Sequence, residues 1–274
     1  MYRSYDVNLP ELGHFSLLLR SNFEEIPEEA GRDNVHIHDA IEFYVLERGD
    51  ISFFVGDKLY ELTPGDVILA KPNEMHNCVR NSRCIHNHYC LWFSPACEAL
   101  LADFLKHPTG EGNLIRLSAE EKRQLLALCE KVFAEAGGGK SISAYSSAVA
   151  ILELCRGGLN VFPEEQSMPE ELVRVLQLIE ERMESIASVK DLCEALFMSQ
   201  STMLRLFRRH LGVSPHEYLD ARRLVMARNY LSEGKSVTDA AALTGFTSTS
   251  VFIRLFRRRF GITPLKYRQM THKN

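Results

Sequence analysis

The chain has 274 residues, enough for one large domain or two ordinary ones. Hydrophobic residues make up 45% and charged residues 25%, values that are typical of a globular protein and exclude a disordered one. No apolar run reaches the roughly 18 residues of a membrane span, and residues 1–10 lack a signal-peptide pattern. The seven cysteines form no Cys-x-x-Cys pair. We therefore expect a cytoplasmic protein with no membrane partner.

Charge is distributed unevenly along the chain, whose formal net charge is −4. Residues 169–274 carry 17 basic and 11 acidic side chains, whereas the other 168 residues carry 15 basic and 25 acidic ones. A basic region can bind phosphate, which an acidic region repels. This asymmetry indicates two domains with different tasks.

Short strand-like segments fill the first part of the chain. Each is rich in β-branched or aromatic residues, and turn signals such as those at 56–57 and 64–66 separate them. Several short strands at close spacing favour a small all-β barrel or sandwich. The predicted strands are residues 14–20, 41–46, 51–55, 58–62, 67–70 and 86–93.

Helical patterns follow the strands. Ser118 and Glu121 form a capping-box pattern ahead of a helix that should end at residues 137–139, and a second helix is expected at 141–156. Small side chains in the second helix allow close packing, either against a second chain or within the domain. Residues 157–169 contain two prolines and lack periodicity, so we expect the domain boundary there.

An internal repeat is the strongest pattern in the sequence. The segment LRLFRRHLGVSPHEY at 204–218 recurs as IRLFRRRFGITPLKY at 253–267, an offset of 49 residues. Apolar and arginine positions coincide, as do the glycine and the proline. Two copies at this distance indicate a duplicated supersecondary unit rather than a solenoid.

Each copy has the layout of a helix-turn-helix. A short helix, at 189–196 or 237–243, leads through a tight turn into a second helix with arginines on its outer face. A connecting helix at 215–231 could hold the two units over successive major grooves, roughly 34 Å apart. Arginine can pair with guanine, small polar or methyl groups can contact other bases, and capped helix N-termini can bind phosphate. The predicted contacts to double-stranded DNA are Gln200, Ser201, Thr202, Arg205, Arg208, Arg209, Thr249, Ser250, Val251, Arg254, Arg257 and Arg258.

The last hundred or so residues resemble the DNA-binding domain of the AraC/XylS family of bacterial regulators, and the segment at 245–268 is very specific for it. The resemblance implies a two-part DNA reader that usually activates transcription with RNA polymerase and often acts as a homodimer. By position, it implies that one recognition helix reads bases with Ser201, Thr202 and Arg205, and the other with Ser250, Val251 and Arg254. Leu204 departs from the pattern, because many relatives have a polar residue there.

The first domain resembles a cupin, a small double-stranded β-barrel. His36, His38, Glu42 and Gly49 match the first cupin motif, and residues 65–81, with His76, approximate the second. AraC-type regulators often carry such a sensor domain. The resemblance implies that a small molecule, frequently a sugar or a related carbon source, enters the barrel. The predicted pocket residues are His36, His38, Glu42, His76, His88 and Trp92.

Two roles remain open for His36, His38, Glu42 and His76. Alternation along a strand would place His36 and His38 on one face, as two ligands of one ion require, and three histidines with one carboxylate suit Mn, Fe, Ni or Zn. The same residues could instead serve as polar groups of the pocket or as hydrogen-bonding groups of the barrel. No cofactor is therefore certain, and a divalent transition metal is the alternative.

The sequence predicts a two-domain α+β protein. Residues 1–160 form a cupin-like barrel with trailing helices for ligand sensing and dimerisation, and residues 168–274 form an all-α domain with two helix-turn-helix units. We expect a sequence-specific transcription regulator, an activator rather than an enzyme, that responds to a small molecule. The alternative is a metal-dependent cupin enzyme with a helical appendage, which would have no need of two tandem DNA readers.

Overall fold

The computed structural model describes residues 2–9, 15–25, 35–82, 84–159 and 168–271. The chain divides into two compact units. The first comprises Met1–Arg32 and His38–Ser167, and the second Asp33–Ile37 and Met168–Asn274. The predicted domain boundary falls largely on residues 160–167, which lie outside the described residues.

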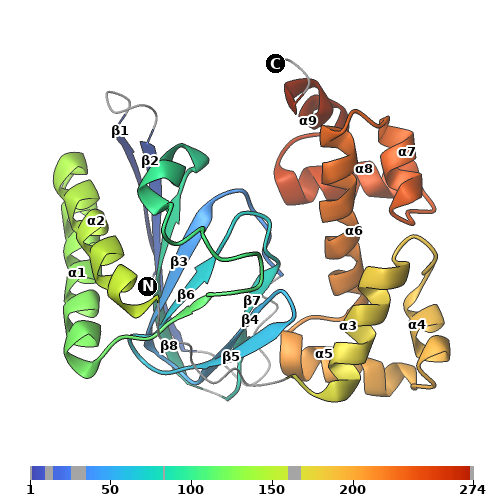
Figure 1. The fold of residues 1–274 in the computed structure, drawn as a ribbon, viewed down its shortest axis with the longest axis horizontal. Helices are drawn as coiled ribbons and strands as arrows, with labels where there is room; N and C mark the ends of the chain where they lie inside the picture. Colours follow the sequence, from blue (N-terminus) through green and yellow to red (C-terminus); the bar gives the residue numbers. More distant parts are fainter. Residues whose placement is uncertain (1, 10–14, 26–34, 83, 160–167, 272–274) are drawn as a thin grey trace. The chain divides into compact units, whose positions relative to one another are not determined.

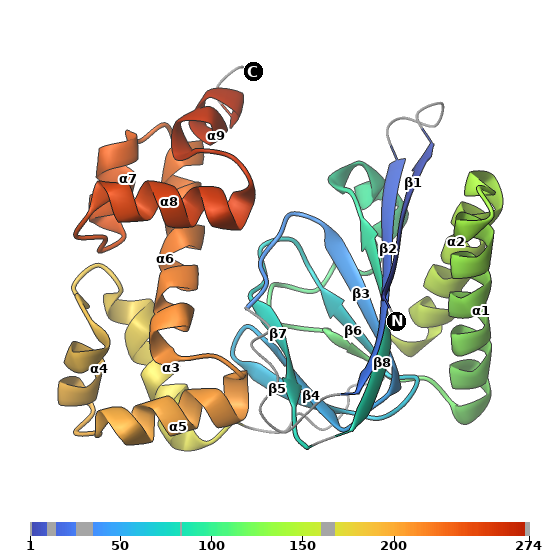
Figure 2. The same cartoon turned by 180° about the vertical axis from the view of Figure 1, so that it is seen from behind.

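The first unit is built on two antiparallel sheets (Figures 1 and 2). The larger sheet has the strand order β1-β2-β8-β3-β6-β9, and the smaller has the order β5-β4-β7. The strands are β1 (Tyr2–Leu9), β2 (Phe15–Glu25), β3 (Ile41–Arg48), β4 (Ile51–Val55), β5 (Lys58–Leu62), β6 (Val67–Ala70), β7 (His76–Arg80), β8 (Ile85–Phe93) and β9 (Leu114–Ile115).

Side chains of β3 alternate between two apolar clusters. Phe43 and Val45 pack in the cluster that continues into the helices, whereas Tyr44 and Leu46 pack with residues of the smaller sheet. Because both faces of β3 are covered, its first six residues are all buried. The space between the two sheets is thus the interior of the predicted barrel.

Two helices cover the outer face of the larger sheet, α1 (Ala119–Gly137) and α2 (Ser141–Gly158) (Figure 1). The predicted capping box is present, because the Ser118 side chain accepts from the Glu121 N–H while the Glu121 carboxylate accepts from the Ser118 N–H. Ser147 of α2 donates to Glu135 of α1 (2.7 Å), and Ala144 and Ala148 are buried. These small residues therefore pack within the unit. A short 3-10 helix, η2 (Pro95–Leu101), follows β8.

The second unit is helical, and its long helix α6 runs between the others (Figure 2). Leu224, Ala227 and Leu231 of α6 form a core with Phe252 and Phe256. The helices are α3 (Glu170–Arg182), α4 (Val189–Ala195), α5 (Gln200–Leu211), α6 (Pro215–Ser232), α7 (Val237–Leu243), α8 (Thr249–Phe260) and α9 (Pro264–Thr271).

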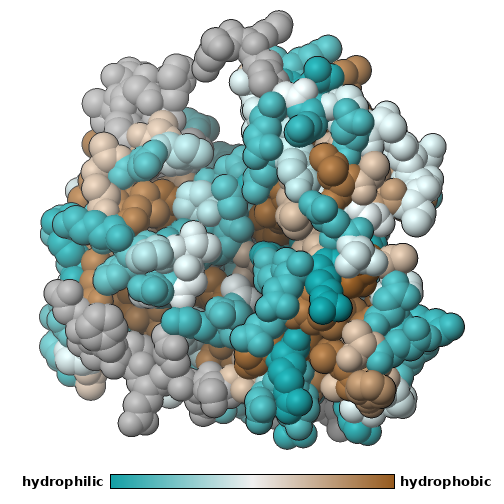
Figure 3. Space-filling view, turned by 45° about the vertical axis from the view of Figure 1, so that its right-hand side comes forward, coloured by the Kyte–Doolittle hydropathy of each residue, from teal (hydrophilic) through white to brown (hydrophobic). Residues whose placement is uncertain are grey.

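No described helix is long and apolar enough to cross a membrane. On the face seen in Figure 3, hydrophilic side chains surround the hydrophobic ones.

Candidate DNA-binding surface and barrel site

Two copies of a helix, a turn and a second helix carry the predicted DNA contacts. Serine caps the second helix in both copies. Ser199 accepts from the Thr202 N–H (3.1 Å) and Ser248 from the Val251 N–H (3.4 Å). Both helices end at a glycine in the left-handed region, Gly212 (φ 71°) or Gly261 (φ 73°). The repeat in the sequence is thus a repeat in the structure, and α5 and α8 are the candidate recognition helices.

Helix α5 presents a polar and basic face. Gln200, Ser201, Arg205 and Arg209 are exposed, and Thr202 is half-buried and accepts a hydrogen bond from Ser199 (2.9 Å). The apolar side of the helix, formed by Met203, Phe207 and Leu211, is buried. The exposed face contains the groups that contact base edges and phosphates in major-groove recognition.

Helix α8 repeats this face. Ser250, Val251, Arg254 and Arg257 are exposed, and Thr249 is half-buried. None of the ion pairs between described residues includes Arg205, Arg209, Arg254 or Arg257. An exposed guanidinium with no carboxylate partner can contact DNA without first breaking an ion pair.

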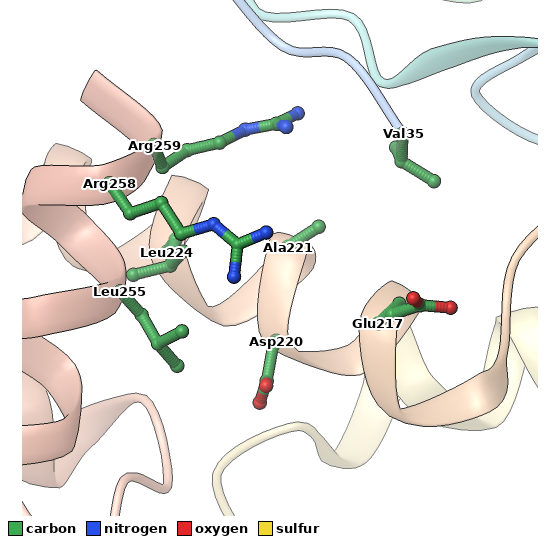
Figure 4. Close-up of a pocket in the computed structure, with 8 residues that line it drawn as sticks. All are labelled: Val35, Glu217, Asp220, Ala221, Leu224, Leu255, Arg258 and Arg259. Atoms are coloured by element: carbon green, nitrogen blue, oxygen red, sulfur yellow. The ribbon is translucent and has the colours of Figure 1, made fainter. Parts of the chain in front are cut away.

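Two of the predicted arginines, Arg208 and Arg258, lie beside residues of α6. Arg208 forms an ion pair with Glu217 at the start of α6 (3.4 Å) and donates to the Gly212 carbonyl (3.4 Å). Arg258 extends from α8 over a hollow beside α6, into which Asp220 also points (Figure 4). Both arginines therefore face α6, unlike Arg205 and Arg254.

Three ligand-type side chains meet inside the barrel. His38 Nε2 lies 2.8 Å and His76 Nε2 lies 3.1 Å from the same oxygen, Oε2 of Glu42. Glu42 and His76 are buried, and His38 is partly exposed. Burial raises the pKa of Glu42, but hydrogen bonds and charge from His38 and His76 outweigh it and hold the pKa well below the usual range.

The backbone contacts of the two histidines limit where the protons of neutral rings can lie. His38 Nδ1 contacts the Ala40 carbonyl (3.0 Å) and His76 Nδ1 contacts the Glu74 carbonyl (2.9 Å). Because a carbonyl oxygen only accepts, both Nδ1 atoms must carry the proton of a neutral ring. Both Nε2 atoms then present lone pairs to a carboxylate, which is repulsive unless the rings are charged or a cation lies between them. Two imidazole lone pairs, a carboxylate oxygen and Nδ1–H groups fixed by carbonyls match a transition-metal ligand set.

A second aromatic and histidine group lines the same interior. The Tyr44 hydroxyl and His86 Nε2 are hydrogen-bonded (2.7 Å), and His88 stacks on Tyr44 with a centroid distance of 4.9 Å. The ring centroids of Trp92 and His38 lie 5.2 Å apart. His88 Nδ1 is buried and has no hydrogen-bond partner among the described residues. The interior therefore combines aromatic surfaces with polar groups, as small-molecule sites do.

The predicted strand that would bring His36 and His38 onto one face is wrong. The structure has only a single bridge residue at His36, and the chain bends at residues 39–40 before β3 begins. His36 is exposed and does not belong to the three-residue ligand group. Its segment, Asp33–Ile37, is assigned to the other compact unit.

Sequence reasoning missed Tyr44 and interpreted His86 as an ordinary strand residue or pocket lining. The signal was the alternation along β3 and β8, which places Tyr44 and His86 on the same face as Glu42 and His88. The strand register places Trp92 opposite Glu42 and His88 opposite Leu46. This register sets which predicted pocket residues are neighbours.

The comparisons with known proteins agree with this architecture. A model described as a helix-turn-helix domain matches residues 192–270, and one described as an AraC-like ligand binding domain matches residues 24–152. The fold and site thus define a DNA-binding transcription regulator with a ligand-binding domain, a class that is not enzymatic. More particularly, the chain belongs to the AraC family of helix-turn-helix regulators. The alternative of a cupin enzyme is set aside.

Similar proteins include the uncharacterized HTH-type transcriptional regulator YbfI of Bacillus subtilis (strain 168), which is 26% identical over 220 residues, 77% of this chain and 78% of YbfI. The HTH-type transcriptional activator RhaS of Salmonella schwarzengrund (strain CVM19633) is 28% identical over 228 residues, which are 77% of this chain and 78% of RhaS. A solved AraC-type regulator structure from Chromobacterium violaceum is 30% identical, covers 38% of this chain and 93% of its own, and has a TM-score of 0.35.

Proposed function

We propose that the chain is a sequence-specific transcription activator whose barrel binds a small-molecule effector. In this proposal residues 168–274 read DNA, and residues 1–160 sense the effector and pair two chains. The observation that carries the DNA-reading part is the duplicated capped helix, which in each copy exposes arginines that form no ion pair with a described residue. The activator role, RNA polymerase as a partner and the homodimer rest on the family, in which RhaS is named an activator.

Base reading is assigned to the N-terminal halves of the two recognition helices. These halves carry Ser201, Thr202 and Arg205 in α5 and Ser250, Val251 and Arg254 in α8. The free guanidinium of Arg254 suits a bidentate contact with guanine. Arg209 and Arg257 lie one turn further along and suit phosphate contacts.

Replacing Arg254 tests base reading. Arg254→Ala should weaken binding to the preferred duplex by about 1–3 kcal/mol and relax the preference at one base pair. In vitro selection of duplexes from a random library, followed by affinity measurements on single-base variants, checks this. An Arg209→Ala variant serves as a control that should weaken all sequences alike. Equal weakening of every duplex by Arg254→Ala would instead make Arg254 a phosphate contact.

For the barrel, we propose that His38, Glu42 and His76 hold a divalent transition metal. The convergence of the three ligand atoms supports this, and so do the Nδ1 contacts to carbonyls, because neutral rings would turn both Nε2 lone pairs toward the Glu42 carboxylate. The metal would supply a Lewis-acid site to which an oxygen donor of the effector could bind. His88 and Trp92 would line the remaining space and orient the effector.

Metal content measured by mass spectrometry tests the barrel site. We expect about one equivalent in the purified wild type and loss of it in His38→Ala. His88→Ala is the matched control, since it removes a barrel histidine outside the ligand group and should retain the metal. A wild type without metal, or equal loss in both variants, would contradict the site and leave the cluster as pocket polarity.

A further inference from the structure

One buried arginine contacts both helix-turn-helix units. Arg223 lies near the middle of α6, the helix that joins the two units, and only 6% of its surface is exposed. A buried guanidinium is costly unless its N–H groups are used and its faces are packed. Its contacts therefore indicate why it is there.

On the side of the first helix-turn-helix, formed by α4 and α5, Arg223 contacts the segment that leads into α4. Its Nη2 donates to the carbonyl of Ile186 and contacts that of Ala187 (3.5 Å). These carbonyls directly precede Ser188, whose capping box with Asp191 begins α4. Helix α4 in turn leads into α5, so this contact sets where the first recognition helix starts.

On the side of the second helix-turn-helix, formed by α7 and α8, the same guanidinium lies against the turn between these two helices. Its carbon atom is 5.8 Å from the ring centre of Phe246. A Cβ atom added to Gly245 would lie 3.1 Å from Nη2 and 3.3 Å from Nε of Arg223. Gly245 also has a φ of +76°, so it meets two demands, the left-handed turn and the space for the guanidinium. The turn that leads into α8 is built around Arg223.

We propose that Arg223 is a positioning residue that fixes the two recognition helices relative to one another and thereby sets the operator spacing that the protein accepts. The proposal rests on the proposed reading of DNA by both α5 and α8. A planar fork with donors on one side and an aromatic ring on the other can brace two elements at once, which a lysine ammonium cannot do. Among the described residues, the one ion-pair partner of neighbouring Arg222 is Glu180 of α3.

The test measures affinity as a function of the spacing between the two contacted segments. The full chain first selects a duplex from a random library, and one base pair is then inserted or removed between the protected segments. Each change shifts the second segment by roughly 3.4 Å and rotates it by about a tenth of a turn. We expect the wild type to lose at least about tenfold in affinity for either change, since only one spacing fits rigid helices.

Arg223→Lys should flatten this profile. We expect lower affinity for the selected duplex and similar affinities, within about threefold, for all three spacings, because the units then adapt independently. Arg222→Lys is the matched control and should keep the wild-type profile. Gly245→Ala, which crowds the guanidinium from the other side, should flatten the profile as well.

An Arg223→Lys profile as steep as that of the wild type would overturn the proposal. Loss of the folded helical signal in both Arg223→Lys and Gly245→Ala would also overturn it, because Arg223 would then hold the fold and not the spacing. If the wild type itself is indifferent to spacing, the proposed two-unit reading fails, whatever the variants do.

Discussion

His88 in the barrel is a neutral histidine by virtue of its surroundings. Burial, reinforced by the charges of His86 and Arg80 and opposed by Glu42, lowers its pKa from the ordinary 6.5 to about 3. In the unfolded chain the ring takes up a proton below about pH 6.5. Between these two values the unfolded state binds more protons, so the stability of the first unit falls as pH falls.

Replacing this ring should therefore reduce the acid sensitivity of the first unit. His88→Phe keeps the stacking on Tyr44 and removes the titration, so between pH 7 and 5 the wild type should lose at most about 2 kcal/mol more stability than the variant. The only tryptophan, Trp92, lies in this barrel, so its fluorescence reports denaturant unfolding of this unit. Parallel stability profiles of metal-free wild type and variant would contradict the assignment.

Motif spacing grouped His38, Glu42 and His76, whose ligand atoms lie close together, with His36, which is not a member of that group. His38, Glu42 and His76 meet because β3 and β7 lie in facing sheets. His36 satisfies the same spacing but precedes the bend before β3, and spacing alone does not reveal a bend. The hydrogen bonds from Nδ1 to carbonyls, which carry the metal argument, depend on backbone positions that no residue pattern specifies.

At the scale of elements, apolar strands were easier to predict than polar ones. The strands at 41–46, 51–55, 58–62, 67–70 and 86–93 are confirmed with small changes at their ends, and the strand expected at 14–20 runs from Phe15 to Glu25, with His14 outside the described residues. Strand β1, at the edge of the larger sheet, and β7 were missed, as was the two-residue apolar β9, which is too short to show a period. Strands β1 and β7 are rich in polar residues and are held by pairing with other strands, so local periodicity does not indicate them.

The two helix-turn-helix turns differ in a way that the repeat obscures. The first turn spans residues 196–199 and the second spans 244–248, so the second is one residue longer. Phe197, 99% exposed, takes the left-handed position (φ 52°) that Gly245 takes in the second turn. A left-handed conformation strains a bulky side chain, and full exposure gives this one no packing in return.

Phe197→Gly should therefore stabilise the second unit, by about 0.5–1 kcal/mol, because relief of the strained conformation exceeds the added entropy of the unfolded chain. Phe197→Ala, which keeps the Cβ atom, is the control and should give little gain. The measurement is denaturant unfolding followed by helical circular dichroism, with Trp92 fluorescence to separate the first unit. A Gly variant no more stable than the Ala variant would show that the turn is unstrained.

At the scale of the whole molecule, the charge asymmetry agrees with the division of tasks. The basic excess of residues 169–274 is concentrated on the helices of the second unit, where α5 and α8 alone carry seven arginines. The sequence repeat predicted both copies, since local capping and periodicity specify each helix. It did not predict Arg223, because a single side chain that contacts two turns is a tertiary feature.

Footprinting with hydroxyl radicals on a selected duplex tests the central claim that two helix-turn-helix units of one chain read DNA. We expect two protected segments for each bound chain, about one helical turn apart on one face of the duplex. Arg205→Ala should weaken protection of one segment and Arg254→Ala that of the other. A single protected segment, or the same segment lost in both variants, would contradict the account.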